Sequence, residues 1–204
     1  MATLNNTLTD FRKALKGGGA RPNLFEVTIP DFPGNDGVKG SNAAGDFTML
    51  IKAAQLPEST VGLVEIPFRG RTFKVAGDRT FAPWSITVIN DTDFKARKAL
   101  ESWSQQIAQY SDASGFSNPG NYMTDAHVTQ LKRKKISSEK YDGGGLEPVT
   151  SYTFYDIWPT SISSIDLSYD SSDVIEEFNV EFQVNYWAPD TAIPSDGDAT
   201  SATE

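Results

Sequence analysis

His127 is the single histidine of this 204-residue chain, so it is the one candidate base for a Ser-His-Asp triad. Asp125 lies close to it in the sequence, but the spacing indicates no serine partner. Cysteine is absent, which excludes a cysteine nucleophile, a disulfide framework and a thiolate metal site. A surface or packed histidine is therefore the favoured interpretation.

Acidic side chains suggest two further kinds of site. Asp166, Asp170 and Asp173 carry carboxylates that suit calcium, but they lack the alternating ligand positions, the glycine and the final glutamate of an EF-hand loop. Glu176 and Glu177 could act as the paired carboxylates of a glycosidase. Neighbouring residues in a strand point to opposite faces, so these two cannot share one site. The sequence predicts no catalytic, cofactor-binding or metal-binding residue and no enzymatic activity.

The basic run Lys132, Arg133, Lys134 and Lys135 could contact phosphate groups. In a strand its charges alternate between the two faces, and lysines at a sheet edge also prevent aggregation. The whole chain has 27 acidic and 18 basic side chains and a formal net charge of −9. A conventional nucleic-acid-binding protein needs a basic surface, so that class is disfavoured.

The position of the charges is more informative than their sum. All basic side chains lie between Arg12 and Lys140, so residues 1–140, with 14 acidic side chains, have a formal charge of +4. Residues 141–204 have 13 acidic side chains and no basic one, a charge of −13. This separation favours association between unlike surfaces of identical subunits. The alternative is that part of the excess belongs to a solvated tail.

Length and composition indicate one folded domain. The chain is long enough to bury a core, and 38% hydrophobic with 22% charged residues is typical of a globular protein. No apolar run approaches the roughly 18 residues of a membrane span. The start of the chain is polar and lacks a hydrophobic secretion core. We therefore expect no membrane anchor and no signal peptide.

Alternating apolar residues predict a succession of strands, separated by segments rich in glycine and proline. Trp84, Ile86 and Val88 mark one of them. Gly70 is expected to bend another strand, and Pro159 to end a third. The predicted strands cover residues 23–29, 47–54, 64–75, 84–89, 126–136, 150–158, 162–169 and 178–186.

The strand at 178–186 has the clearest pattern. Its apolar side chains occupy every second position and are predicted to point inward: Phe178, Val180, Phe182, Val184 and Tyr186. The polar residues between them are predicted to form a solvent-facing row: Glu177, Asn179, Glu181, Gln183 and Asn185.

One segment changes to a helical period. Apolar residues between 93 and 110 follow a 4-3-4-3 spacing, which predicts an α-helix with one apolar face: Ala96, Leu100, Trp103, Ile107 and Tyr110. Asn90 or Asp91 is expected to cap its start. A second, short helix is predicted over residues 4–16, with Leu8, Phe11 and Leu15 on one face.

Together these elements predict a mainly β fold, an antiparallel β-sandwich or barrel of about eight strands with one principal flanking helix at about 93–110. Residues 20–187 form the expected β domain. An N-terminal segment with a glycine linker precedes it at 1–19, and a disordered acidic tail is expected at 188–204.

Five blocks of sequence, taken in order, are similar to one known family. They are Ala-Arg-Pro-Asn-Leu-Phe-Glu-Val at 20–27, Lys-Ala-Ala-Gln-Leu-Pro at 52–57, Val-Ala-Gly-Asp-Arg-Thr-Phe at 75–81 followed by Trp84 and Thr-Val-Ile-Asn-Asp at 87–91, Ile-Trp-Pro-Thr at 157–160, and Phe-Asn-Val-Glu-Phe at 178–182 ending in Asn-Tyr-Trp at 185–187. The chain resembles the tail tube protein of contractile-tailed bacteriophages. Departures from the family fall in loops, at 30–46 and 111–124.

The resemblance implies a structural virion protein without cofactors or enzymatic activity. Subunits of this family form six-membered rings, whose sheets join edge to edge and which stack into a tube inside the contractile sheath. The implied partners are further copies of the chain, the sheath, baseplate and tail-terminator proteins, and the tape-measure protein and genomic DNA that pass through the lumen. The implied location is the virion tail, assembled in the cytoplasm of the bacterial host.

Three surfaces are candidates for these contacts. The polar row from Glu177 to Asn185 would face the lumen, where an acidic or neutral surface lets DNA slide, or else the sheath. The basic run from Lys132 to Lys135 would meet a neighbouring subunit or the sheath, and Leu56, Pro57 and Glu58 would reach the next ring. Alternative functions are a carbohydrate-binding β-sandwich module or, within the same fold, a secretion-system or bacteriocin tube or a tube-initiating baseplate protein.

Overall fold

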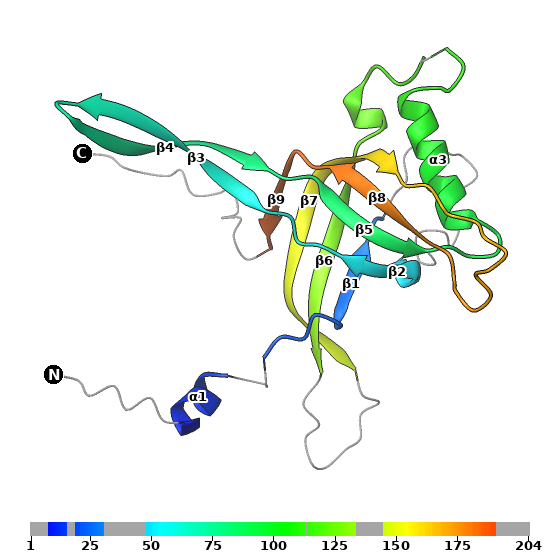
Figure 1. The fold of residues 1–204 in the computed structure, drawn as a ribbon, viewed down its shortest axis with the longest axis horizontal. Coiled ribbons are helices and arrows are strands. Elements are labelled where there is room, and N and C mark those ends of the chain that lie inside the picture. The colour runs from blue at the N-terminus through cyan, green and yellow to red at the C-terminus, as the bar shows by residue number, and fades with distance from the viewer. Residues whose placement is uncertain (1–7, 16–18, 31–47, 113, 134–144, 191–204) are drawn as a thin grey trace, which may run out of the picture.

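Figure 1 presents the computed structural model, which describes residues 8–15, 19–30, 48–112, 114–133 and 145–190. Ala188 and Pro189, the first residues of the tail expected at 188–204, instead belong to a strand that covers Tyr186–Pro189, and residues 191–204 lie outside these ranges. The helices and strands within them are, in chain order, α1 (Leu8–Ala14), β1 (Phe25–Thr28), β2 (Ile51–Ala54), β3 (Ser59–Phe68), β4 (Arg71–Phe81), β5 (Trp84–Ile89), α3 (Lys95–Ile107), the 3-10 helix η2 (Pro119–Asn121), β6 (Thr124–Arg133), β7 (Leu146–Ile162), β8 (Glu177–Gln183) and β9 (Tyr186–Pro189).

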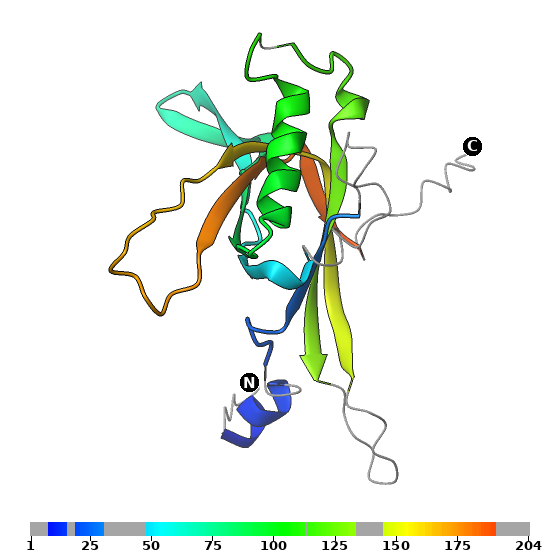
Figure 2. The same cartoon turned by 90° about the vertical axis from the view of Figure 1, so that its right-hand side faces the viewer.

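An antiparallel sheet forms the body of the molecule. Its strands follow the order β1-β6-β7-β8-β5-β2, with β9 paired to β7, whereas β3 and β4 form a separate two-stranded sheet. Figure 2 shows α3 in front of the body sheet. The predicted mainly β, antiparallel fold with one principal helix is therefore confirmed.

Aromatic side chains fill the core between the sheet and α3. Trp84 of β5 stacks on Phe154 of β7 with ring centroids 4.9 Å apart, and it lies 5.4 Å from the ring of Phe182 on β8. Trp103 of α3 contacts the same Phe182 at 5.9 Å. The alternation Trp-Ser-Ile-Thr-Val-Ile produces β5 at the predicted residues 84–89, because it places one apolar row on the buried face.

The helix α3 is shorter than predicted, and its cap differs. It begins after Phe94, which has a positive φ of 57° and no capping side-chain hydrogen bond. The prediction of Asn90 or Asp91 as the cap is wrong, since the Asn90 amide instead donates to the Glu176 carboxylate at 2.9 Å. Ala96, Leu100 and Trp103 form the buried face as predicted, whereas Tyr110 lies beyond the end of the helix and is exposed.

The long strand β7 corrects two predictions. It continues through Pro159, because a register shift between Pro159 and Ser161 opposite β8 accommodates a residue without an N–H group. The chain then leaves the sheet after Ile162, so the predicted strand at 162–169 is wrong. Leu167 and Tyr169 are exposed there and pack against no partner strand within the described residues.

The stretch 64–75 is two strands rather than one bent strand. Arg69 and Gly70, with φ values of 45° and 81°, form a two-residue turn that reverses the chain completely. The resulting hairpin of β3 and β4, residues 59–81, is called the arm below. In Figure 1 it extends away from the body toward the left.

The N-terminal helix α1 is also shorter than predicted, and it covers residues 8–14. Leu8, Phe11 and Leu15 are all exposed, so the apolar face predicted for this helix packs against nothing in the described part of the chain. The predicted strand at 47–54 is reduced to β2, because residues 48–50 form a helical turn.

Candidate assembly surfaces

The arm has one apolar face that is open to solvent. Direct cross-strand partners lie on the same face of a hairpin, and Val64 pairs with Val75 and Ile66 with Phe73. Phe68 extends the row beside the turn. These five side chains are between 39% and 65% exposed. The opposite face contains the pairs Glu65–Lys74 and Pro67–Thr72, so the two faces of the arm differ in polarity.

Two glycines allow the strands of the arm to approach at an irregularity near its base. The register shifts between Val61 and Leu63, and Gly62 lies opposite Gly77 in this bulge. A Cβ atom on Gly77 would lie 3.2 Å from the backbone C and O atoms of Gly62. A larger residue at Gly62 or Gly77 would therefore crowd the backbone of the opposite strand. A bulge bends the strand that contains it, so this one influences the direction of the outer part of the arm.

The solvent-facing side of β2, β5 and β8 forms a polar surface, which we call the polar wall. Its members come from adjacent strands and lie on the face opposite the core: Lys52, Ser85, Thr87, Glu177, Asn179 and Glu181. Lys52 Nζ forms an ion pair with Glu177 at 2.5 Å, and the Thr87 hydroxyl donates to Asn179 Oδ1 at 2.8 Å. Two pairs of side chains in the polar wall thus bond to each other. The carboxylate of Glu181 is a further charged group on this surface.

The structure brings together only part of the predicted polar row. Glu177, Asn179 and Glu181 are exposed and alternate with buried Phe178, Val180 and Phe182, as predicted. Gln183 ends β8 and is half-buried. Asn185 lies beyond the strand, where its side chain donates to Asp156 at 3.4 Å. Tyr186 was predicted to point inward, but it belongs to β9, is 45% exposed and stacks on Tyr155.

The segment predicted to reach the next ring connects β2 to the arm. Leu56 is 52% exposed and Glu58 is exposed, whereas Pro57 is buried against the body. The Glu58 carbonyl accepts from the Ala82 N–H at 3.0 Å, which ties the two sides of the arm's base together. This segment therefore anchors the arm, while the arm itself projects from the body.

Two of the four residues in the basic run are described. Lys132 and Arg133 are exposed at the end of β6, and Lys132 forms an ion pair with Glu147 of β7 at 3.4 Å. Lys134 and Lys135 lie outside the described residues. Lys132 therefore has a partner on the neighbouring strand of its own chain.

His127 is half-buried on β6, and its Nδ1 lies 3.1 Å from the Thr153 hydroxyl oxygen. Thr153 donates its own proton to the Asp190 carboxylate at 2.9 Å. This hydroxyl therefore points its proton away from the imidazole, the reverse of the order in a Ser-His-Asp triad. The pKa of exposed Asp112 is lowered because the Ser114 hydroxyl and N–H donate to its carboxylate.

Other kinds of site can be assessed in the described ranges. No group of three or more His, Asp or Glu side chains there has the arrangement needed to hold a metal ion. No helix in these ranges has the length and apolarity needed to cross a membrane.

Sequence reasoning missed the arm as a surface. A signal was present, because apolar residues alternate both before and after Arg69-Gly70, and a glycine at this position suits a tight hairpin turn. The non-glycine residue at positive φ made the turn hard to recognise, since asparagine or aspartate is usual there.

Comparisons with known proteins agree with this architecture. The family model described as "Phage tail tube protein" matches residues 20–189. The tail tube protein gp19 of Enterobacteria phage T4 is 32% identical over 180 residues, covering 87% of this chain and 97% of that protein.

Solved structures with the same fold come from contractile injection systems. One is a sheath-tube complex of an extracellular contractile injection system, with a TM-score of 0.53 and 13% identity, covering 87% of this chain and 95% of that chain. Another is the tube-terminating cap of the anti-feeding prophage, with a TM-score of 0.54 and 14% identity over 83% of this chain and 89% of that chain.

Proposed function

This chain belongs to the phage tail tube protein family, and we propose that six copies of it close into a ring and that these rings stack into the inner tube of a contractile tail. Family membership makes the protein a structural component of the virion tail. The observation that best supports the proposed assembly is the apolar face of the arm, which a single chain leaves exposed to water.

That apolar face needs a covering surface. Monomeric proteins rarely expose large contiguous apolar patches, and each large apolar side chain gains about 1.5–3 kcal/mol when it is fully buried. The arm also has two long strands that form a separate two-stranded sheet, so their outer edges can hydrogen-bond to a neighbouring strand. A second copy of the chain supplies both an apolar cover and strand edges.

The polar wall is suited to line the lumen. Lys52 offsets the charge of Glu177. The polar wall of each subunit therefore has one net negative charge, that of Glu181. Duplex DNA carries about one negative charge per 1.7 Å of its axis, so a neutral to weakly acidic surface does not retain it. Six copies of this wall would form a conduit through which the genome passes without tight binding.

The remaining partners follow from the same role. The solved structures of similar fold include a sheath-tube complex and a tube-terminating cap. We place a contractile sheath around the tube, a baseplate at its start and a terminator at its end. The tape-measure protein and the DNA would occupy the lumen in turn.

Negative-stain microscopy of the purified chain tests the proposal directly. Rings or tubes of uniform width with six-fold symmetry are expected, because assembly covers the apolar faces of the arms. A variant with Phe73→Ser and Ile66→Ser provides the matched control, and it should remain monomeric. A wild-type protein that stays monomeric, and that binds sugars in a glycan assay, would contradict the tube role and favour a binding module.

A further inference from the structure

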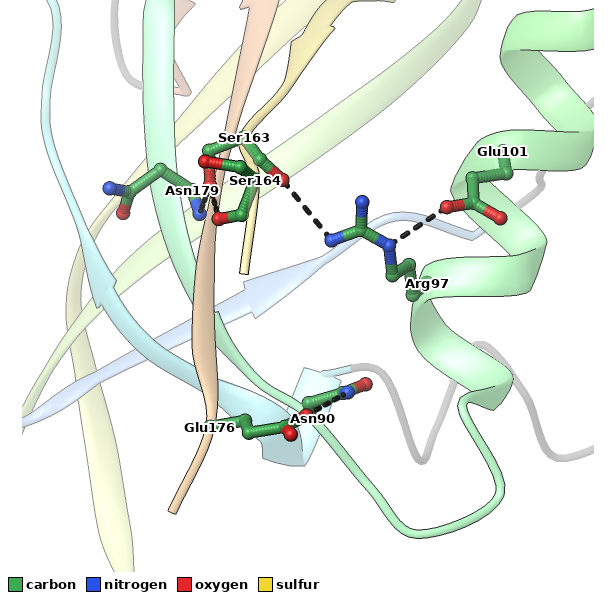
Figure 3. A network of polar contacts seen from close by, with 7 residues as sticks. All are labelled: Asn90, Arg97, Glu101, Ser163, Ser164, Glu176 and Asn179. Carbon is green, nitrogen blue, oxygen red and sulfur yellow. Dashed lines mark hydrogen bonds and ion pairs between the residues drawn. The ribbon is translucent and has the colours of Figure 1, made fainter. Parts of the chain in front are cut away.

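Residues 163–176, between β7 and β8, form a loop that we call the acidic loop. Its first residue, Ser163, is held by the body. The Arg97 guanidinium donates to the Ser163 carbonyl at 3.1 Å, and the Ser163 N–H donates to the Asn179 carbonyl at 2.8 Å (Figure 3). The Asn179 N–H in turn donates to the Ser163 hydroxyl at 2.9 Å. This end of the loop is therefore fixed to both α3 and β8.

The other end of the acidic loop is fixed in the same way. The Asn90 N–H donates to the Glu176 carbonyl at 2.9 Å, and the Asn90 amide donates to the Glu176 carboxylate at the same distance (Figure 3). Two fixed ends limit the conformations open to the loop, which lowers the entropy cost of binding.

The middle of the acidic loop is apolar and uncovered. Its large side chains are at least 66% exposed and belong to the residues that line a hollow of about 750 Å³: Leu167, Tyr169, Val174 and Ile175. In Figure 2 the loop stands away from the body sheet at the left. The loop also contains four carboxylates and no basic residue: Asp166, Asp170, Asp173 and Glu176.

The tip of the arm has the complementary composition. Phe68 and Phe73 are each 65% exposed, and the Arg69 guanidinium lies over the Phe68 ring at 5.4 Å. Lys74 is paired with Glu65 at 3.6 Å, whereas Arg69 and Arg71 have no ion-pair partner among the described residues. The tip therefore presents two apolar rings beside two positive charges.

Resting on the tube role proposed above, we propose that the tip of the arm of one copy docks on the acidic loop of the next copy. The two surfaces match in apolar character and are opposite in charge, which favours this pairing over others. In Figure 1 the arm extends to the left and the acidic loop lies at the right-hand end of the molecule. One chain cannot join its own two ends, so the contact is head-to-tail and generates a ring or a stack.

Cysteine cross-linking tests the pairing, because the natural chain contains no cysteine. A variant with Arg71→Cys and Asp170→Cys is assembled and treated with a short bismaleimide. The expected result is a ladder of three or more covalently linked copies on a denaturing gel. A ladder that stops at six places the contact within a ring, and a longer one places it between rings.

Matched variants make the cross-linking specific. Each single-cysteine variant should give dimers at most, and Arg71→Cys combined with Gln105→Cys on the exposed face of α3 should give no ladder. If tubes form but the Arg71→Cys, Asp170→Cys variant gives no ladder, the pairing is wrong while the tube role stands. If the wild-type chain forms neither rings nor tubes, the tube role fails, and this inference fails with it.

Charge exchange provides a second test. Arg69→Glu with Arg71→Glu should lower assembly at least tenfold, and so should Asp170→Lys with Asp173→Lys. Mixing the two variants should restore assembly, because copies that alternate place the acidic tip of one variant on the basic loop of the other, and the basic tip on the acidic loop. Combining all four changes in one chain should restore assembly as well. A loop variant that assembles normally but no longer binds the sheath protein would assign the loop to the sheath and overturn the proposal.

Discussion

The body and the arm are both antiparallel β structure, yet they cover their apolar residues in different ways. In the body, Trp84, Ile86 and Val88 on β5 are buried in one core cluster with apolar residues of α3 and of the neighbouring strands. In the arm, Ile66 and Phe73 remain 48% and 65% exposed although they follow the same alternation. An alternating strand therefore specifies an apolar face, but it does not specify whether the same chain or another copy covers that face.

Replacing a core residue of the body gives the largest expected effect. Trp84→Ala removes a fully buried ring that stacks on Phe154 and contacts Phe182. The free energy of unfolding should fall by about 3–5 kcal/mol, since the cavity is only partly refilled. Urea unfolding followed by circular dichroism on the monomeric fraction measures this change. A loss below about 1 kcal/mol would mean that the body, like the arm, depends on another copy for its stability.

Replacing the apolar face of the arm should leave the fold of the monomer unchanged. Ile66→Ser with Phe73→Ser is expected to lower the free energy of unfolding of the monomer by about 1 kcal/mol or less, because the two side chains are already 48% and 65% exposed and form one cross-strand pair. Assembly measured by sedimentation velocity should be abolished. Glu65→Ser with Lys74→Ser, on the opposite face, is the matched control and should still assemble. Equal loss of assembly from both faces would contradict the comparison.

The bulge at the base of the arm should have an intermediate effect. Gly77→Ala places a Cβ atom 3.2 Å from the Gly62 backbone, so the strands must separate slightly and the arm must change direction. We expect the concentration needed for assembly to rise roughly tenfold, equivalent to about 1.4 kcal/mol. Light scattering over a dilution series measures that concentration. An unchanged value would indicate that the direction of the arm is not critical.

The polar wall should have the smallest effect on folding and assembly. Glu177→Lys with Glu181→Lys breaks an exposed ion pair with Lys52, and exposed pairs contribute about 0–1 kcal/mol. Tubes should still form, but a basic wall should slow genome release. Phage carrying this tube protein can be compared with wild type by the rate of DNA ejection. An unchanged rate of DNA ejection would indicate that the polar wall does not line the lumen.

The sequence predicted the parts of the fold whose pattern has a single interpretation. Residues 84–89 form a strand, and Ala96, Leu100 and Trp103 share a buried helix face, because each period places every apolar residue on one side. Pro159 was misjudged because a register shift absorbs its missing N–H, and such a shift depends on the neighbouring strand. The local spacing of apolar residues does not predict which distant strands pair, or in which register.

The candidate surfaces follow the same division. Glu177, Asn179 and Glu181 were identified because alternation alone assigns them to the solvent-facing side of β8. Asn185 was predicted to extend the same row, but β8 ends at Gln183 and the Asn185 side chain turns to Asp156. The arm was missed because exposure is a property of the folded chain, and alternating apolar residues ordinarily indicate burial within it.

The path of β7 has a mechanical consequence for a filament. Its first part pairs with β6 and β9, and its last part pairs with β8, with Asp156 at a positive φ of 54° where the strand bends from one to the other. A single covalent strand therefore links the two halves of the body. Shear between those halves loads peptide bonds and rows of hydrogen bonds together, and not side-chain packing alone. In the proposed tube, this strand would resist deformation of each subunit under a force along the tube axis.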